Sequence, residues 1–177
     1  QRPRLIVVMP TAFVRVDYLV QKNFEQKDTG YCFRFIRNMR FCDLYAEDET
    51  AFREWKVQLG KVFIQVDFHT KFNTIKMIGK GSFARVYLVE DKETRNRYAV
   101  KAFSKEYLLS QAKGRESLIN EIGIMQRLHH PYIMNLEEVH ESKNSVYLVL
   151  ELLEGGELLN YLSHKDGFNE NDVARVL

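Results

Sequence analysis

The sequence predicts an α+β fold in two parts, and two patterns indicate it. Between residues 31 and 66, two short strand-like stretches are followed by one amphipathic helix. From Thr74 onward, strand-like stretches follow one another, with a single longer helical segment among them. Alternating apolar residues predict strands, whereas apolar residues at spacings of three and four predict helices. We expect the first part to span residues 1–70 and the second to span residues 72–177.

The composition fits a folded protein of one or two small domains. Of the 177 residues, 45% are hydrophobic and 28% are charged, which excludes a disordered tail. The net charge of +2 provides no dense field for nucleic acid or an anionic membrane. Two cysteines are too few for a disulfide framework, and the longest apolar run, Leu5 to Met9, is too short to span a bilayer. We therefore expect a soluble, cytoplasmic protein with no nucleic acid partner.

The first part is predicted to contain a β-hairpin followed by a helix. Two strand-like stretches, 31–36 and 41–46, flank a polar loop, and the aromatic residues of the first stretch alternate onto one face. The acidic segment 47–50 indicates a helix start, and the helix is predicted from about Thr50 to Val66. Its apolar stripe consists of Phe52, Trp55, Leu59, Val62 and Val66.

A hairpin followed by a helix with a tryptophan in its second turn resembles the C-terminal part of a pleckstrin-homology domain. That resemblance implies that Trp55 is the buried anchor of the helix, although many other α+β domains end in the same way. Residues 1–30 are too few for all the strands that hold phosphoinositides in that fold. Arg2, Arg4 and Lys22 are expected to be solvated charges. Contact with phosphoinositides or a membrane stays open but has no support in the sequence.

A glycine-rich turn opens the second part. Residues 78–86 predict a strand, a tight turn and a second strand. Because glycine has no Cβ, the backbone N–H groups of such a turn can approach a polyphosphate. A plain hairpin turn would show the same pattern, and no helix follows as in a Rossmann or Walker A loop. The candidate nucleotide-binding residues of this segment are Ile78, Gly79, Lys80, Gly81, Ser82, Phe83, Ala84 and Val86.

A lysine and a glutamate follow this turn at set intervals. Lys101 ends a predicted strand fifteen residues after Val86, and Glu121 lies twenty residues later on a helix predicted at 118–128. A cation that grips phosphates needs a carboxylate to fix its position, so we expect the two side chains to meet. Each residue alone would be a solvated surface charge.

This order of elements resembles the eukaryotic protein kinases over residues 72–177. The resemblance implies that Lys101 and Glu121 are catalytic residues and that the glycine-rich loop binds ATP. Ala84 takes the place of the third glycine of the kinase pattern, and we expect this small residue to be tolerated. The implied fold is an N-lobe, in which a C-helix packs on five antiparallel strands, followed by the start of the C-lobe. The basic segment 104–115 is most similar to the serine/threonine kinases of the cyclic-nucleotide- and calmodulin-dependent groups.

The last two predicted strands, 136–140 and 145–151, lead into a segment that resembles the kinase hinge. A bland turn at the end of a strand is the alternative interpretation. The resemblance places Met125 and Leu136 in a hydrophobic spine. The residues that it implies around the adenine and ribose are Val86, Ala99, Leu150, Glu151, Leu153 and Glu157. The adjacent His129 and His130 are interpreted as a turn, and no metal site is predicted.

The catalytic parts of a kinase are missing from this sequence. Neither His-Arg-Asp nor Asp-Phe-Gly occurs in it, both ends look cut, and residues 169–172 begin a helix near the end. We therefore expect a fragment, inactive alone, of an ATP-dependent serine/threonine kinase that uses Mg²⁺ and a protein substrate. The alternative is a non-catalytic nucleotide-binding or docking module that ends naturally at Leu177.

Overall fold

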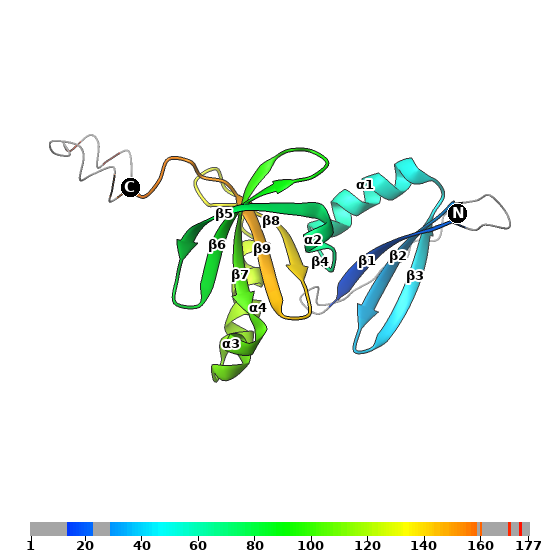
Figure 1. Cartoon of the computed structure of the whole chain (residues 1–177), viewed down its shortest axis with the longest axis horizontal. Helices are drawn as coiled ribbons and strands as arrows, with labels where there is room; N and C mark the ends of the chain where they lie inside the picture. Colours follow the sequence, from blue (N-terminus) through cyan, green and yellow to red (C-terminus); the bar gives the residue numbers. More distant parts are fainter. Residues whose placement is uncertain (1–13, 23–28, 159, 161–169, 171–173, 175–177) are drawn as a thin grey trace.

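The computed structural model describes residues 14–22, 29–158, 160, 170 and 174. These residues form nine strands and four helices (Figure 1). In chain order the elements are β1 (Arg15–Lys22), β2 (Thr29–Arg37), β3 (Arg40–Ala46), α1 (Glu49–Gly60), β4 (Ile64–Gln65), α2 (Phe68–Lys71), β5 (Phe72–Lys80), β6 (Ala84–Asp91), β7 (Arg97–Ser104), α3 (Lys105–Ser110), α4 (Gly114–Met125), β8 (Leu136–Glu141) and β9 (Ser145–Glu151). Arg2, Arg4, the Lys22 side chain, Leu177 and most of the helix start predicted at 169–172 lie outside the described part.

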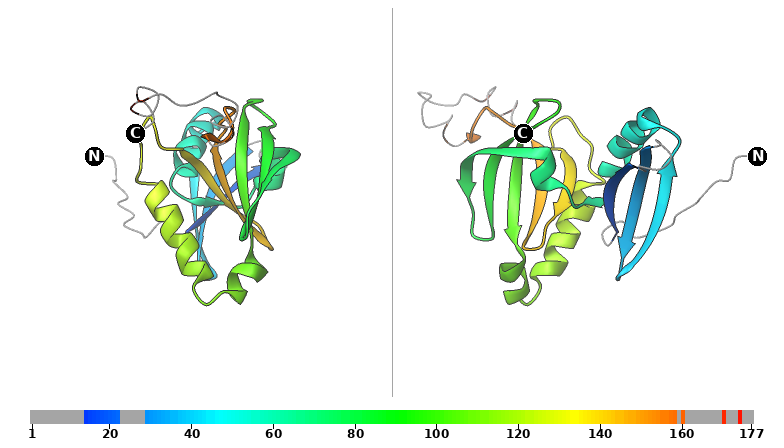
Figure 2. Two further views of the ribbon diagram at one scale, coloured as in Figure 1. Left: turned by 90° about the vertical axis from the view of Figure 1, so that its left-hand side faces the viewer. Right: turned by 45° about the vertical axis from the view of Figure 1, so that its right-hand side comes forward.

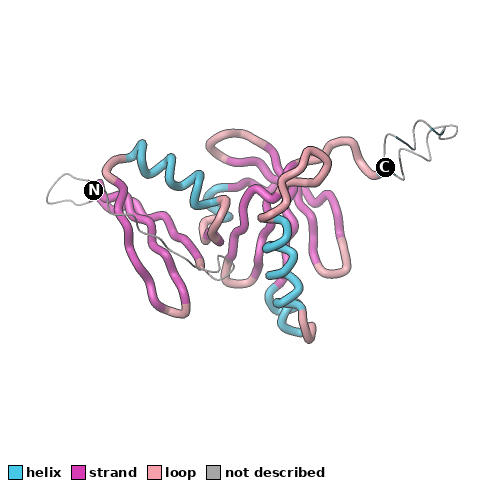
Figure 3. The backbone as a smooth tube through the Cα atoms, turned by 180° about the vertical axis from the view of Figure 1, so that it is seen from behind, coloured by secondary structure: helices cyan, strands magenta, loops and turns pink. Residues whose placement is uncertain are grey.

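All nine strands belong to one sheet, in the order β3-β2-β1-β4-β8-β9-β7-β6-β5. Strands β1–β3, here called the N-terminal sheet, pair antiparallel, as do β5–β9, here called the C-terminal strands. The short strand β4 lies between these groups and pairs in parallel with both β1 and β8. Figures 2 and 3 show the two groups side by side. The prediction of a five-stranded sheet is thus corrected. The five strands β5–β9 are present, but β8 also pairs with β4, which joins them to the N-terminal sheet.

The predicted hairpin of the first part is confirmed. Strands β2 and β3 pair from Tyr31 opposite Ala46 to Arg37 opposite Arg40. The two residues of the turn, Asn38 and Met39, have φ values of 47° and 63°. Two-residue turns with positive φ match the right-handed twist of a hairpin, and this match imposes the left-handed conformation on Met39 despite its side chain.

Helix α1 covers one face of the N-terminal sheet. The side chain of Asp48 accepts a hydrogen bond of 2.8 Å from the Ala51 N–H and caps the helix. The ring of Phe52 stacks on Phe33 with 4.8 Å between centroids. Both rings are buried, and Leu59 packs against the same cluster about two turns further along the same face of the helix.

Two predictions about this helix are wrong. Trp55 is 58% exposed, so it is not the buried anchor. The centre of the buried face runs through Phe52 and Leu59, and Trp55 is turned about 60° from Phe52 at 3.6 residues per turn. The helix also ends at Gly60 instead of Val66, because the chain turns to place Ile64–Gln65 as β4 in the sheet.

Helices α3 and α4 lie together below the C-terminal strands in Figure 1. Leu118 and Ile122 of α4 pack with Phe103, Leu148 and Leu150 in one buried cluster. The first residue of α4 is Gly114, where an added Cβ would lie 2.5 Å from the Leu108 carbonyl oxygen. The close approach of α3 and α4 therefore requires a glycine at that position. Within the described residues no helix is both long and apolar enough to cross a membrane.

Candidate functional site

The predicted contact between Lys101 and Glu121 is present. The Nζ atom of Lys101 lies 2.8 Å from Oε1 of Glu121. Lys101 comes from the middle of β7, and Glu121 from α4, which packs against the same face of the sheet. The two side chains are 35% and 39% exposed, so water reaches the pair. Solvent screening makes such a pair a weak contributor to stability and leaves its charges open to a ligand.

Several other predicted site residues lie on this face of the sheet. Val86 of β6 is directly opposite Lys101, and Ala99 is directly opposite Leu150 of β9. Directly opposed residues share a face of a sheet, and alternate residues of one strand do so as well. Leu150 is buried at 4% exposure in the cluster under α4. The small or branched side chains of Val86, Ala99 and Leu150 thus share one face of the sheet with Lys101.

The glycine-rich loop is a closed hairpin turn between β5 and β6. The Gly81 N–H donates to the Ala84 carbonyl at 2.9 Å, so this amide is occupied within the turn. At Gly79, an added Cβ would come 3.4 Å from the Cβ of Val86, which is tight. The exposed tip residue Phe83 leans toward the Tyr107 ring of α3, with 5.9 Å between centroids. The remaining predicted residues of the loop, Ile78, Lys80 and Ser82, are also exposed.

The hinge predicted after β9 begins at Glu151. Its carboxylate accepts hydrogen bonds from the Asn135 backbone N–H at 3.0 Å and from the Asn135 side-chain amide at 3.4 Å. The Glu151 N–H donates in turn to the Asn135 carbonyl at 3.2 Å. Leu153 is 65% exposed and Glu157 is exposed as well. Their contacts with adenine and ribose stay predictions, whereas Asn135, which the sequence did not single out, fixes the start of the segment.

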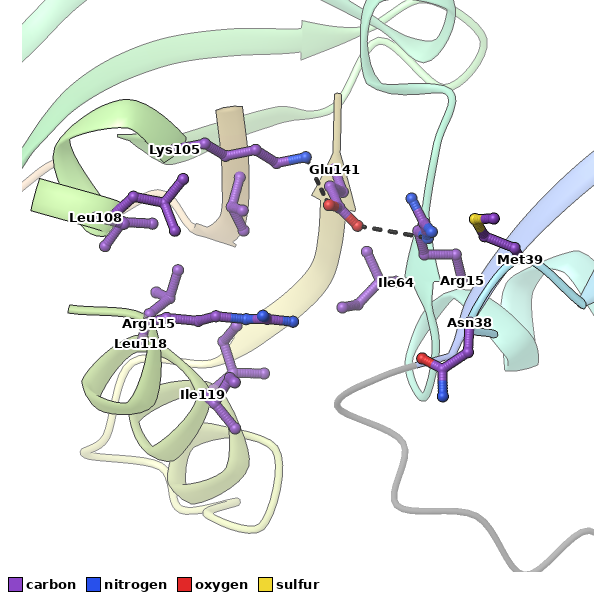
Figure 4. Close-up of a pocket in the computed structure, with 13 residues that line it drawn as sticks. Arg15, Asn38, Met39, Ile64, Lys105, Leu108, Arg115, Leu118, Ile119 and Glu141 are labelled. Atoms are coloured by element: carbon purple, nitrogen blue, oxygen red, sulfur yellow. Dashed lines mark hydrogen bonds and ion pairs between the residues drawn. The ribbon is translucent and has the colours of Figure 1, made fainter. Parts of the chain in front are cut away.

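A cavity of about 440 Å³ lies beside the candidate site but is separate from it (Figure 4). Glu141 stands at its edge, 2.6 Å from the Nζ atom of Lys105 and 3.7 Å from the Nε atom of Arg15. Leucine and isoleucine side chains of α3 and α4 form one wall, and Arg15 with Met39 of the N-terminal sheet stands opposite. None of the predicted nucleotide-binding residues lines this cavity.

A cluster of buried charges near β4 was missed by the sequence analysis. His140 is fully buried in β8, with Glu138 two residues before it on the same strand. Asp67 and Lys71 reach the cluster from the segment around α2. A carboxylate and a histidine at alternate positions of a predicted strand could have signalled it, because one strand face then carries charge into the sheet.

Known proteins match this chain over its second part and beyond. The protein kinase domain family matches residues 72–177. Calcium-dependent protein kinase 4 of Plasmodium falciparum is 38% identical over 132 residues, which are 73% of this chain and 25% of that protein. Human serine/threonine-protein kinase H1 is 40% identical over 107 residues, or 60% of this chain and 24% of that protein.

Human serine/threonine-protein kinase H2 is 36% identical over 107 residues, which cover 60% of this chain and 27% of that protein. The chain thus spans about a quarter of the length of these curated relatives. The family match covers more than half of the chain and begins where β5 begins. With the Lys101–Glu121 pair beneath a glycine-rich hairpin, it leads to one conclusion: the chain belongs to the protein kinase family.

Proposed function

We propose that this chain carries the nucleotide-binding half of an ATP-dependent serine/threonine protein kinase. The observation that carries the proposal is the ion pair of Lys101 and Glu121, which holds a partly exposed ammonium group between the sheet and α4. When bound, ATP would supply the phosphoryl group that the whole protein transfers to a serine or threonine hydroxyl. The names of the relatives, which include serine/threonine-protein kinases, support this assignment.

The residues on the face below β6 and β7 suit a nucleotide. The half-buried Val86 and Ala99 offer apolar surface for a purine beside the buried Leu150, and Lys101 offers a positive charge for its phosphates. These features fit ATP.

The magnesium ion of the proposal has no assigned ligands in the described part of the chain. Among the described residues no group of three or more histidine, cysteine or acidic side chains is arranged to hold a metal ion. We therefore assign no residue to Mg²⁺. The cation and the protein substrate belong to the proposal for the whole protein.

The test is binding of ATP to the chain, followed by titration calorimetry or a fluorescent nucleotide analogue. Lys101→Met removes a charge-assisted contact, and we expect about a 10- to 100-fold loss of affinity. Lys143→Met makes the same substitution at an exposed lysine of the β8–β9 turn and serves as the control, with unchanged affinity. In the longer protein, Lys101→Met is expected to abolish phosphoryl transfer. Full affinity and full transfer by the Lys101→Met protein would refute the proposal.

A further inference from the structure

The N-terminal sheet is joined to the C-terminal strands by a very short strand. Ile64 and Gln65 of β4 pair with β1 on one side and with β8 on the other. Gln65 stands opposite His140, and the Ile64 N–H donates to the Val14 carbonyl at 3.2 Å. Two residues provide few ladder hydrogen bonds, so the side chains around β4 must supply much of the attachment. We call β4 and these side chains the joint.

His140 lies at the centre of the joint between two carboxylates. Its Nε2 atom is 2.8 Å from Oε2 of Glu138, and its Nδ1 atom is 3.2 Å from Oδ1 of Asp67. The second contact is not aligned as a hydrogen bond, and neither Nδ1 nor Oδ1 has another partner within the described structure. The Nε2 atom of Gln65 lies 3.4 Å from His140 Nε2. The imidazole is fully buried, so water cannot reach either ring nitrogen.

The two flanking carboxylates favour a charged imidazole. A neutral histidine has one N–H donor and one lone pair, whereas the protonated ring has two donors. Carboxylates only accept, so loss of either proton would turn a lone pair toward a buried carboxylate oxygen of Asp67 or Glu138. An unsatisfied buried acceptor destabilises the fold, and more so when it is charged.

Charged side chains of both signs surround His140. Lys71 binds Glu138 and lies 3.9 Å from Asp91, and Lys56 lies 3.6 Å from Asp67. The rings of Phe68 and Phe72 contact His140, and Tyr18 has its pKa raised, first by burial and then by the charges of Asp67 and Glu138. The three carboxylates of the joint are Asp67, Asp91 and Glu138, and its three cations are Lys56, Lys71 and protonated His140.

The pKa shifts agree with this geometry. Burial lowers the pKa of His140, but its contacts with Asp67 and Glu138 outweigh burial and raise it. Burial raises the pKa values of Asp67 and Glu138, but the contacts with His140 and the nearby lysines outweigh burial and lower both.

We propose that the proton on His140 locks the N-terminal sheet onto the C-terminal strands, so that the joint closes when the imidazole is charged and opens when it is neutral. Opening would separate β4 from β8 and move Arg15 away from Glu141, which forms the second contact across the joint (Figure 4). Because Arg15 and Met39 form one wall of the adjacent cavity, opening would also change the surface beside α4, the helix that carries Glu121. The lock is thus a pH-sensitive device next to the candidate site.

The direction of the pH dependence follows from linkage. His140 has a raised pKa in the closed state, so its stabilisation is complete below about pH 6.5 and is lost as the pH rises through that raised value. The carboxylates have lowered pKa values, so their stabilisation is present above about pH 4 and is lost in stronger acid. The joint is therefore tightest in mildly acidic solution and loosens toward alkaline pH.

Hydrogen exchange of the whole chain between pH 5.5 and 9 tests the lock. The reporter is the Gln65 amide, which faces β8 because the preceding Ile64 amide bonds to Val14 on the other side of β4, and the reference is the Val100 amide in the centre of the C-terminal strands. Each rate is divided by the intrinsic exchange rate at that pH. We expect the protection of Gln65 to fall by up to about tenfold per pH unit between the open-state and closed-state pKa values of His140. The protection of Val100 should change much less.

Three variants sharpen the test. His140→Gln is neutral at every pH and should give low, pH-independent protection of Gln65, whereas His129→Gln removes an exposed histidine and should match the parent chain. Asp67→Asn removes one of the two negative charges that raise the pKa of His140, so the fall in protection should move to lower pH. This shift still tests the proposal if the His140→Gln chain does not fold. The proposal is overturned by a flat profile in the parent chain, by an unshifted profile in Asp67→Asn, or by an NMR titration showing His140 neutral at pH 6.

Discussion

The packing of α1 on the N-terminal sheet makes a sharp prediction about two aromatic residues. Phe52 is 7% exposed and has three aromatic neighbours within 6.2 Å, whereas Trp55 is 58% exposed. Replacing a core phenylalanine by alanine costs about 3–5 kcal/mol. We expect about 3 kcal/mol for Phe52→Ala, the low end, because the flanking Tyr18 and Tyr31 are only partly buried and can relax into the space.

The matched control is Trp55→Ala, three residues along the same helix. It should cost less than about 1 kcal/mol, since most of the indole already meets water. For a chain of this length, a loss of 3 kcal/mol lowers the midpoint of thermal unfolding by about 6–12 °C. Far-UV circular dichroism is the right assay, because Trp55 is the only tryptophan and its variant loses the fluorescence signal. Equal losses for the two variants would refute the packing that we describe.

Three further changes probe other parts of the chain. Met39→Gly should stabilise the β2–β3 hairpin by about 1 kcal/mol, because the left-handed φ of 63° strains any side chain; an unchanged midpoint in urea would contradict this. Arg34 binds Asp43 through two hydrogen bonds of 2.8 Å and lowers the pKa of the Asp43 carboxyl. The stability gained from the pair should therefore be present at neutral pH and lost as the pH falls through that lowered pKa. Asp43→Asn should remove this part of the acid dependence of the thermal midpoint. Lys71→Met should destabilise the chain by about 3 kcal/mol by leaving Glu138 without its lysine, and a midpoint within 1 °C of the parent would rule that out.

The second part of the chain was easier to predict from sequence than the first. The strands and helices of 72–151 follow one another in the predicted order, and the spacing of Lys101 and Glu121 is set by a strand and a helix that leave little freedom. The contact of these two side chains follows from that order, and the structure contains it. The nucleotide contacts of the hinge could not be tested in the same way, because they involve a ligand and the exposed segment after β9.

The first part shows where pattern alone is insufficient. The stripe that includes Trp55 and Val66 fits a long helix, but spacing does not say which edge of a stripe meets the sheet or where the chain leaves the helix. That exit is determined by β4, whose two residues pair with strands about 50 residues before and 75 residues after it. Long-range pairing of so short a strand leaves almost no local signal, and the same is true of the charges gathered around His140.

The continuity of the sheet through β4 has a practical consequence for anyone who trims this protein. Cutting the chain at Phe72, where the family match starts, would strip β8 of its neighbour and leave a bare strand edge. Bare edges recruit other strands and promote aggregation. The cut would also remove Asp67 and Lys71, the counter-charges of the buried His140 and Glu138. Recombinant work should therefore keep residues 1–71 with the segment that matches the protein kinase domain, even when only nucleotide binding is of interest.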